Sequence, residues 1–424
     1  MRVLLISPNR EEINMVTWPL GLACVAAATQ KAGHDVKLLD LMETNDAAGA
    51  LKEAIAALHP DVIGISVRNI DDQTMEPPQF LLEEVKEFID VCRNLSNAPI
   101  VLGGAGYSIF PESALEFLGA NIGIQGEGEV AFPELLTRME QGRDLSGVPG
   151  LYLYKAGPRG KRELSKDLDE FPLPGSHLLS AARYSDKQFW LPVQTRRGCP
   201  MNCSYCSTAV IEGCITRKRS PKVVVQWLNE WVRIGLKQFY FVDNTFNLPP
   251  SYARMLCSEL VEAGLDIAWR CILYPVRISE QLISLMAASG CAEVSLGFES
   301  GHELILHGMN KHFKPDDVRH TSGLLGKHGI RRMGFLLLGG PGETKESALE
   351  SLEFADSLHL EAMKVSVGIR IYPYTVLADV ARKEGVISPD DNLLFPRFYV
   401  VQGLEDWLRE TVKDWAAHRP SWMG

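Results

Sequence analysis

The chain has no long hydrophobic stretch. In its 424 residues, no run reaches the roughly 18 consecutive apolar residues that a membrane-spanning helix needs. The apolar run that follows Arg2 is also too short for the core of a secretory signal peptide. We therefore expect neither a membrane span nor a secretory leader.

An excess of positive charge is missing as well. There are 43 lysines and arginines against 53 aspartates and glutamates, a formal net charge of −10, so nucleic acid is disfavoured as a partner. The nine cysteines are an odd number and most of them are scattered, which argues against a disulfide framework. We expect a reducing cytoplasm as the location. The length allows two or three domains, each with a full core.

What the sequence does have is a group of three cysteines in one short stretch. Cys199, Cys203 and Cys206 lie in Arg-Arg-Gly-Cys-Pro-Met-Asn-Cys-Ser-Tyr-Cys, residues 196–206. Three thiolates can hold a cubane [4Fe–4S] cluster and leave one iron open to a small chelating molecule. The alternative is structural zinc, which needs four ligands, usually as cysteine pairs. Cys214 is eight residues further on and the next histidine is His302, so the pattern favours the cluster.

The first 140 residues alternate short apolar runs with amphipathic segments. This alternation predicts an α/β fold with a parallel, doubly wound sheet, in which ligands bind beyond the carboxyl ends of the strands. Glycines follow two of the strands, where they either let a ligand approach the backbone closely or simply form turns. We expect strands at 3–7, 35–39, 62–66, 100–103 and 121–124, and helices at 20–31, 47–58, 81–92 and 130–139.

Residues 141–190 lack long periodic segments. A small hairpin is expected at 147–154, and the proline-rich segment 171–175 is expected to be an extended linker that marks a domain boundary. From residue 191 the alternation resumes and predicts a partial (β/α)6 barrel of the TIM type. Its expected strands are 191–195, 238–242, 267–272, 293–298, 333–338 and 365–371, with helices beginning near Pro221, Ser251, Ser279, Lys314 and Thr344.

The predicted barrel places the cysteine stretch where chemistry is expected. The three cysteines follow its first strand, and barrel sites gather at the C-terminal ends of strands. The expected division is therefore 1–140, a linker at 141–190, the barrel at 191–385, and a short, mostly helical region at 386–424. We expect this last region to cap the open barrel, and the alternative is a tail that only packs on the fold.

Two stretches resemble a known family. Residues 196–206 resemble the signature of the radical S-adenosylmethionine (SAM) enzymes, and about the first 140 residues resemble the cobalamin (B12)-binding domain that precedes many radical-SAM domains. Together they resemble the cobalamin-dependent radical-SAM enzymes, of the class B methyltransferase type. The resemblance implies a Rossmann-like, flavodoxin-like domain before the barrel. It also implies a [4Fe–4S] cluster, SAM and cobalamin as cofactors.

The same resemblance implies a set of SAM contacts. Tyr205 would lie beside the adenine, and Asp243 and Asn244 would hold the amino group, where the family usually has Gly-Gly-Glu. Glu299, in Ser-Leu-Gly-Phe-Glu-Ser-Gly, would meet the ribose hydroxyls or the amino group. Gly339, in Leu-Leu-Leu-Gly-Gly-Pro-Gly-Glu-Thr, would accommodate the adenine.

Alternatives remain open for these acidic residues. Asp243 and Asn244 are also typical of a turn before a helix. Glu299 could instead close the barrel rim through a salt bridge with Arg270 or Arg277.

The cobalamin contacts implied by the resemblance lie in loops after the N-terminal strands. The sequence contains no Asp-x-His-x-x-Gly, so no histidine is offered as a lower ligand of the cobalt. The loop 68–71 is the candidate for lying beneath the cobalt, or else it is a solvated turn. The expected cobalamin-binding residues are Ser7, Arg68, Asn69, Gly103, Gly104, Gly106, Gly126 and Glu127.

The resemblance implies reductive cleavage of SAM to a 5′-deoxyadenosyl radical and, most often, methylation of an unactivated carbon or of phosphorus. One alternative is a radical-SAM cyclase or ring-rearranging enzyme that transfers no methyl group. Another is a corrin-binding sensor without catalysis. The expected partners are a small-molecule or lipid-precursor substrate and an external electron donor of the flavodoxin or ferredoxin type. No catalytic side chain is assigned.

Overall fold

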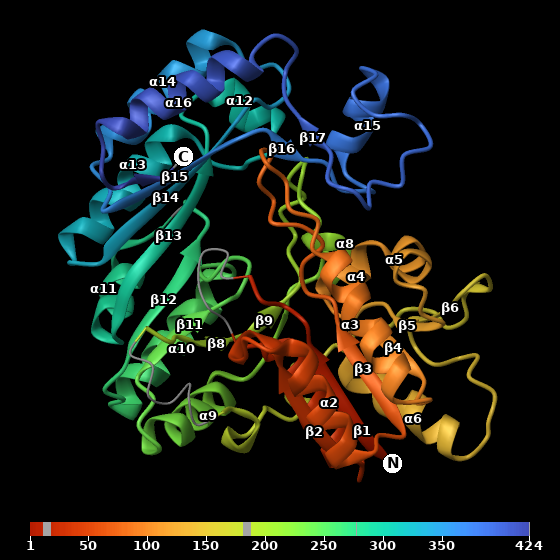
Figure 1. The fold of residues 1–424 in the computed structure, drawn as a ribbon. Helices are drawn as coiled ribbons and strands as arrows, with labels where there is room; N and C mark the ends of the chain where they lie inside the picture. The colour runs from red at the N-terminus through yellow and green to blue at the C-terminus, as the bar shows by residue number, and fades with distance from the viewer. Residues whose placement is uncertain (12–17, 181–187, 277, 424) are drawn as a thin grey trace. The chain divides into compact units, whose positions relative to one another are not determined.

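The computed structural model describes residues 1–11, 18–180, 188–276 and 278–423. Its contacts divide the described chain into two compact units (Figure 1). The first contains Met1–Gln73, Pro77–Phe189 and Val210–Gly213, and the second contains Thr74–Glu76, Trp190–Ala209 and Cys214–Gly424. The described residues of the expected linker, 141–180 and 188–190, thus belong to the first unit except for Trp190.

The first unit is built on a sheet with the strand order β2-β1-β3-β4-β5-β6-β7. Strands β1 to β5 pair in parallel, and the order 2-1-3-4-5 is that of flavodoxin-like sheets. The expected hairpin is present as β6 and β7, which extend the sheet antiparallel beyond β5. The strands are β1 (Arg2–Ser7), β2 (Asp35–Asp40), β3 (Val62–Ser66), β4 (Ile100–Gly103), β5 (Ile122–Ile124), β6 (Leu151–Leu153) and β7 (Gly157–Pro158).

Helices cover both faces of this sheet. Helix α1 packs against α6, and α2 packs against α3, so the apolar run of β1 is buried from both sides. Leu22 of α1, Phe132 of α6 and Leu5 of β1 belong to one core. The helices are α1 (Leu20–Lys31), α2 (Ala47–Leu58), α3 (Leu82–Leu95), α4 (Ala105–Ile109), α5 (Pro111–Leu118) and α6 (Gly128–Glu140), with short 3-10 turns η1 (Leu41–Glu43), η2 (Leu168–Glu170) and η3 (Ser176–Leu178).

Helices α4 and α5 were not predicted from the sequence. The segment after β4 was expected to be a glycine loop, but Ala105 already begins α4, and Gly106 lies inside it. These helices are too short to produce a strong periodic pattern. Pro111 at the start of α5 and Gly119 in a left-handed conformation at its end are the local signals that could have revealed the second one.

The second unit is built on a sheet with the order β18-β15-β14-β13-β12-β11-β8. Strands β8, β11, β12, β13, β14 and β15 pair in parallel in sequence order, which confirms the predicted partial barrel. Residues 369–371, expected to extend the last strand, lie beyond β15. The strands are β8 (Leu191–Val193), β11 (Gln238–Phe241), β12 (Ala268–Leu273), β13 (Cys291–Glu299), β14 (Arg331–Leu338), β15 (Ala362–Val367) and β18 (Trp422–Met423).

Five helices of the second unit, α9, α10, α11, α13 and α14, begin where the sequence predicted, whereas α12 and α15 were not predicted. Ser279 caps α11 by accepting a hydrogen bond from the Leu282 amide at 3.3 Å, and Thr344 caps α14 in a capping box with Ser347. The helices are α9 (Pro221–Arg233), α10 (Pro250–Ala263), α11 (Glu280–Ala288), α12 (Glu303–Gly308), α13 (Pro315–Lys327), α14 (Lys345–Ser357), α15 (Val376–Lys383) and α16 (Glu405–Ala417).

The C-terminal segment packs on the edge of the second sheet. β18 pairs in parallel with β15, α16 packs against the same strand, and Arg419 holds Asp356 through two hydrogen bonds of 2.8 and 2.9 Å. These contacts pack the segment against the sheet, and capping of the open barrel by this segment stays a prediction. The remaining short elements are β9 (Arg196–Arg197), α8 (Thr208–Glu212), β10 (Arg217–Lys218), β16 (Ile369–Arg370) and β17 (Phe398–Tyr399).

Candidate functional site

The cysteine stretch leaves the carboxyl end of β8. β9 pairs antiparallel with β10, so the chain departs from this strand pair before the cysteines and returns to it afterwards. All three cysteines are partly buried free thiols, and the Cys206 amide donates to the Cys203 carbonyl at 3.2 Å. Burial raises the pKa of the Cys203 thiol, the positive charge of Lys311 opposes this rise, and the neighbouring Cys206 and Cys199 add to it.

This donor set fits a cluster better than a single ion. Within residues 1–11, 18–180, 188–276 and 278–423, no three His, Cys, Asp or Glu side chains are arranged around one metal ion. A cubane cluster does not need such an arrangement, because each cysteine binds a different iron. Three neighbouring thiols can therefore hold a cluster with one open iron, whereas the zinc alternative lacks a fourth ligand.

A buried ion pair anchors the start of the cysteine stretch. Arg196 Nη2 lies 2.8 Å from Asp243 Oδ2, and the two side chains are 3% and 1% exposed. Asp243 also accepts from the Thr195 amide at 2.7 Å, the Thr195 hydroxyl at 2.6 Å and the Arg196 amide at 2.9 Å. Arg196 Nη1 donates to the carbonyls of Phe246 at 2.6 Å and Leu248 at 3.0 Å. The residues just before the cysteines are thus fixed to the loop after β11.

These contacts bear on the expected role of Asp243. Both of its carboxylate oxygens are engaged by Thr195 and Arg196, so they already have the partners that a buried carboxylate needs. Asn244, the next residue, is half-buried. Contact of either side chain with the SAM amino group stays a prediction, and Asp243 has a structural role in any case.

A second buried ion pair lies beside the cysteines. Lys311 Nζ lies 3.1 Å from Glu299 Oε1, with side-chain exposures of 5% and 14%. The Tyr205 hydroxyl donates to the same Glu299 oxygen at 3.1 Å, and Lys311 Nζ lies 5.4 Å from the centre of the Tyr205 ring. Burial alone would lower the pKa of Lys311, but Glu299, Tyr205 and Cys203 raise it well above its ordinary value. The site therefore holds a charged ammonium and a carboxylate side by side.

Sequence reasoning missed Lys311. It lies in the polar segment between α12 and α13, twelve residues after Glu299, and a lone lysine in such a segment usually belongs to a solvated surface. No periodic pattern distinguishes it. Only the fold, which returns this segment to the end of β13, reveals its position.

The alternative salt bridge for Glu299 named Arg270 and Arg277, and Arg270 is not its partner. Arg270 lies 4.0 Å from Glu293 and is stacked over Trp190 and Tyr240. Arg277 lies outside the described residues. Glu299 does form an ion pair, and its partner is Lys311. Its φ of +62° is uncommon for a residue with a side chain and is a frequent feature of functional sites.

The turn after β14 contains Gly339. This glycine has a φ of +96°, and a Cβ there would lie 3.1 Å from a Val400 methyl group. Glu343, expected to be structural, accepts from the amides of Gly339 and Gly340 and closes this turn. Burial raises the pKa of Glu343 to about 7, although the two amides oppose the rise. Contact of Gly339 with adenine stays a prediction.

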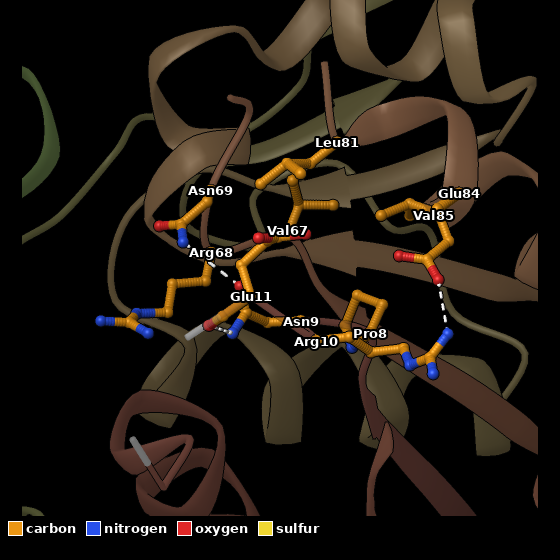
Figure 2. A pocket seen from close by; sticks show the side chains of 10 residues that line it. All are labelled: Pro8, Asn9, Arg10, Glu11, Val67, Arg68, Asn69, Leu81, Glu84 and Val85. Carbon is orange, nitrogen blue, oxygen red and sulfur yellow. Dashed lines mark hydrogen bonds and ion pairs between the residues drawn. The ribbon is translucent and has the colours of Figure 1, made fainter. Parts of the chain in front are cut away.

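In the first unit, the expected cobalamin residues gather at one edge of the sheet. Ser7, Asn69, Gly103 and Gly126 lie at or just after the carboxyl ends of β1, β3, β4 and β5. A pocket between the loops after β1 and β3 is lined by Asn9, Arg68 and Asn69 among others (Figure 2). In a sheet of order 2-1-3-4-5, the gap between β1 and β3 is the topological switch point, where such folds bind ligands.

The two loops of this pocket are linked by polar contacts. Asn69 Nδ2 donates to Asn9 Oδ1 at 3.2 Å, and Arg10 pairs with Glu84 of α3 at 2.9 Å (Figure 2). Arg68, between them, is exposed. The loop after β3 is thus held in place by these contacts.

Several of the expected cobalamin glycines have a packing role. A Cβ on Gly104, whose φ is +101°, would lie 2.5 Å from the Val67 carbonyl, and one on Gly106 would lie 3.0 Å from the Arg68 carbonyl. These glycines let the start of α4 approach the loop after β3. A Cβ on Gly103 would have only one neighbour within 4 Å, the Ile124 carbonyl oxygen at 3.9 Å, so packing does not require a glycine at this position.

The loop after β5, which contains Gly126 and Glu127, also packs against another segment of the protein. A Cβ on Gly126 would lie 2.8 Å from Arg162 Nε, and Glu127 accepts from the Ser165 amide at 2.8 Å. The segment expected as a linker therefore covers this loop. Cobalamin contacts by all of these residues stay predictions, and the geometry gives most support to Arg68, Asn69 and Gly103.

Comparison with known families agrees with this division. The model of the B12 binding domain matches residues 6–136, and the model of the radical SAM superfamily matches residues 193–355. The chain is a radical SAM protein with a B12-binding domain. The first match spans β2 to β5 of the flavodoxin-like sheet. The second spans β11 to β14 of the partial barrel and includes the cysteine stretch and the Glu299–Lys311 pair.

Relatives of this radical SAM protein match along most of its length. An uncharacterized methyltransferase of Pyrococcus horikoshii is 27% identical over 394 residues, which cover 89% of this chain and 83% of the relative. A tryptophan 2-C-methyltransferase of Streptomyces laurentii is 24% identical, over 89% of this chain and 74% of the relative.

A solved structure shares the fold. The radical SAM methyltransferase TsrM of Kitasatospora setae, with cobalamin and a [4Fe–4S] cluster bound, superposes with a TM-score of 0.86 at 22% identity, covering 99% of this chain and 90% of that one.

Among the described residues, none of the helices combines the length and the hydropathy that crossing a bilayer requires.

Proposed function

We propose that this radical SAM protein is a cobalamin-dependent methyltransferase that acts on a small molecule. The observation that carries the proposal is the presence, in one chain, of a three-thiol loop at the mouth of a partial barrel and a B12-binding domain. The relatives and the superposing structure reported above are themselves named methyltransferases, which supports methyl transfer over cyclisation.

The cofactors supply the difficult chemistry. When bound, the cluster and SAM provide a 5′-deoxyadenosyl radical, and cobalamin carries the methyl group. The protein's own residues bind these groups, orient them and keep water out. Cys199, Cys203 and Cys206 would hold the cluster, and Arg68 and Asn69 would lie at the cobalamin.

The Glu299–Lys311 pair suits the amino-acid end of SAM. Glu299 can accept hydrogen bonds from an ammonium group, and Lys311 can donate to a carboxylate. Tyr205, which hydrogen-bonds to Glu299, presents an aromatic ring for stacking, and Gly339 would leave room for the adenine. The amino-acid end of SAM is a zwitterion with one ammonium and one carboxylate. Lys311 and Glu299 offer one charge of each sign side by side, so binding this zwitterion would leave the net buried charge unchanged.

We also propose an external one-electron donor of the flavodoxin or ferredoxin type and a reducing compartment such as the cytoplasm. No cysteine of the described chain is in a disulfide, which agrees with a reducing location. The substrate would be a soluble small molecule or a lipid precursor.

The experiment uses anaerobically reconstituted protein with cobalamin, a chemical reductant and SAM that carries a deuterated methyl group. Methyl transfer should give both 5′-deoxyadenosine and S-adenosylhomocysteine, and a metabolite extract should yield a labelled product by mass spectrometry. Cys203→Ala is the control, and it should abolish deoxyadenosine while leaving the visible spectrum of bound corrin unchanged. A wild-type protein that binds no corrin, or that forms deoxyadenosine without S-adenosylhomocysteine in the presence of a turned-over substrate, would contradict methyl transfer.

A further inference from the structure

An open groove lies on the second unit, outside the residues assigned above. It has a volume of about 910 Å³ and is lined by three neighbouring helices, at residues 220–226 of and just before α9, 251–259 of α10 and 281–285 of α11. Lys222 and Gln226 come from α9, Arg254 and Met255 from α10, and Gln281 from α11. The same helices can be followed side by side in Figure 1, and α10 packs against both α9 and α11.

The groove lies on the same side of the barrel as the cysteines. Helices α9, α10 and α11 follow strands of a parallel sheet, so their N-terminal ends are at the carboxyl edge from which the cysteine stretch departs. Lys218 of β10 pairs with Arg196 of β9, only three residues before Cys199. Three residues span at most about 11 Å, and Ser220, which lines the groove, follows Lys218 by two residues, so this edge of the groove lies close along the chain to the proposed cluster.

The rim of the groove is positively charged although the chain as a whole carries −10. Of the residues that line the groove, Lys222 is exposed, Arg254 is half-exposed and Glu259 is the carboxylate. Lys218, two residues before the lining residue Ser220, is exposed as well. Within the described ranges, neither Lys222 nor Arg254 forms an ion pair. The N-terminal ends of the three helices add partial positive charge. Met255, 51% exposed, contributes an apolar surface in the middle.

We propose that this groove is the docking surface for an acidic one-electron carrier of the flavodoxin or ferredoxin type. The proposal rests on the proposed function, because SAM cleavage at a cluster consumes one electron that the chain itself does not supply. An acidic carrier complements the rim, and such charge complementarity speeds and orients transient encounters. Redox partners typically bury a small interface, which suits a groove of this size.

The electron balance of the encounter is simple. One electron passes from the reduced flavin or iron–sulfur centre of the carrier to the cluster held by Cys199, Cys203 and Cys206. The carrier is oxidised by one electron and the cluster is reduced by one. No covalent bond forms or breaks in this step, so the groove has only to hold the carrier near the cysteine stretch.

The test compares two double variants of equal charge change. Lys222→Glu with Arg254→Glu reverses the rim, and Lys383→Glu with Lys413→Glu reverses two exposed lysines of α15 and α16 that do not line the groove. Binding of an acidic flavodoxin and of an acidic ferredoxin to the anaerobic, reconstituted protein is measured by calorimetry at low and high salt. The rate of cluster reduction is followed by visible absorbance, with each carrier and with dithionite.

The rim variant should bind at least one carrier about tenfold more weakly and be reduced by it about tenfold more slowly, with the difference shrinking at high salt. The control variant should behave as wild type, and dithionite should reduce all three proteins equally. If the rim variant binds and is reduced as wild type, or if neither carrier binds the wild type, the docking proposal is overturned.

Two further outcomes separate the proposals. If the rim variant loses affinity for SAM while carrier binding is unchanged, the groove is a small-molecule site and the docking proposal is wrong. If dithionite-reduced wild type forms no deoxyadenosine from SAM, the proposed function is wrong. The measured binding of the carriers to the wild type and the rim variant still decides whether the groove is a docking surface.

Discussion

At the level of single residues, the candidate site depends on opposite charges that the protein keeps away from water. The Arg196–Asp243 pair fixes the start of the cysteine stretch, and the Glu299–Lys311 pair lies beside its tyrosine. Removing one partner of such a buried pair lowers the free energy of unfolding by about 3–5 kcal/mol, because the other charge is left buried without a counter-charge. The two pairs therefore lead to different predictions, one for stability and one for SAM.

Lys311→Met should weaken SAM binding by at least about tenfold, the equivalent of 1.4 kcal/mol. The reason is that the variant loses the ammonium that would pair with the SAM carboxylate. Lys311→Arg should restore part of the affinity, since it keeps the charge. SAM affinity can be measured by calorimetry, and the cluster content by its visible spectrum. Unchanged SAM affinity in Lys311→Met, with the cluster intact, would show that Lys311 has no role at SAM.

Glu343 should make stability depend on pH. Its pKa is about 7 in the folded protein against 4.5 for an ordinary glutamate, so protonation favours the folded state. The contribution of protonated Glu343 to the free energy of unfolding is fully present below pH 4.5 and is lost as the pH rises to about 7. Urea unfolding at several pH values should show this loss in the wild type and not in Glu343→Gln, which keeps an acceptor for the Gly339 amide. Identical pH profiles would contradict the assignment.

At the level of elements, the strand ends of the barrel are tied together before any cofactor is considered. Thr195 and Arg196, beyond β8, are bound by Asp243, beyond β11. In the first unit, the loops after β1 and β3 are joined by Asn9 and Asn69, and α4 is pressed against the loop after β3. In both units the loops that would meet a cofactor are held by neighbouring strands, which preorganises them.

Asp243→Asn should lower the free energy of unfolding by about 3–5 kcal/mol, because it leaves the Arg196 guanidinium buried without a counter-charge. Adding Arg196→Met should recover much of this loss, since the uncompensated charge is then gone. Urea unfolding of the two variants and the wild type provides the comparison. A cost for Asp243→Asn below about 1 kcal/mol, the value of an exposed pair, would mean that the pair does not anchor these strands.

At the level of the whole molecule, the chain contains two units with separate sheets and separate cores. The cobalamin residues are expected in the first and the cluster cysteines are in the second. A ligand that binds only folded protein stabilises the unit that holds it, by about 2.7 kcal/mol at one hundred times its dissociation constant. The two cofactors should therefore protect different parts of the chain.

Hydrogen exchange followed by mass spectrometry can test this. Hydroxocobalamin should slow exchange in the strands and helices of residues 1–140, above all near 66–71 and 103–109. SAM, added to protein with its cluster, should slow exchange around 196–206 and 299–311 instead. Protection by cobalamin confined to residues 191–385 would show that the corrin is not held by the flavodoxin-like sheet.

The sequence alone determined the order and kind of most elements, because apolar strands that are buried on both faces and helices with capping residues leave clear local patterns. It also placed the three cysteines at the end of the barrel's first strand. It missed α4 and α5, which are short, and it missed Lys311, which looks like any surface lysine until the fold brings it to Glu299. Tertiary structure alone decided which partner each buried charge has, since that depends on segments far apart in the sequence that meet only in the folded chain.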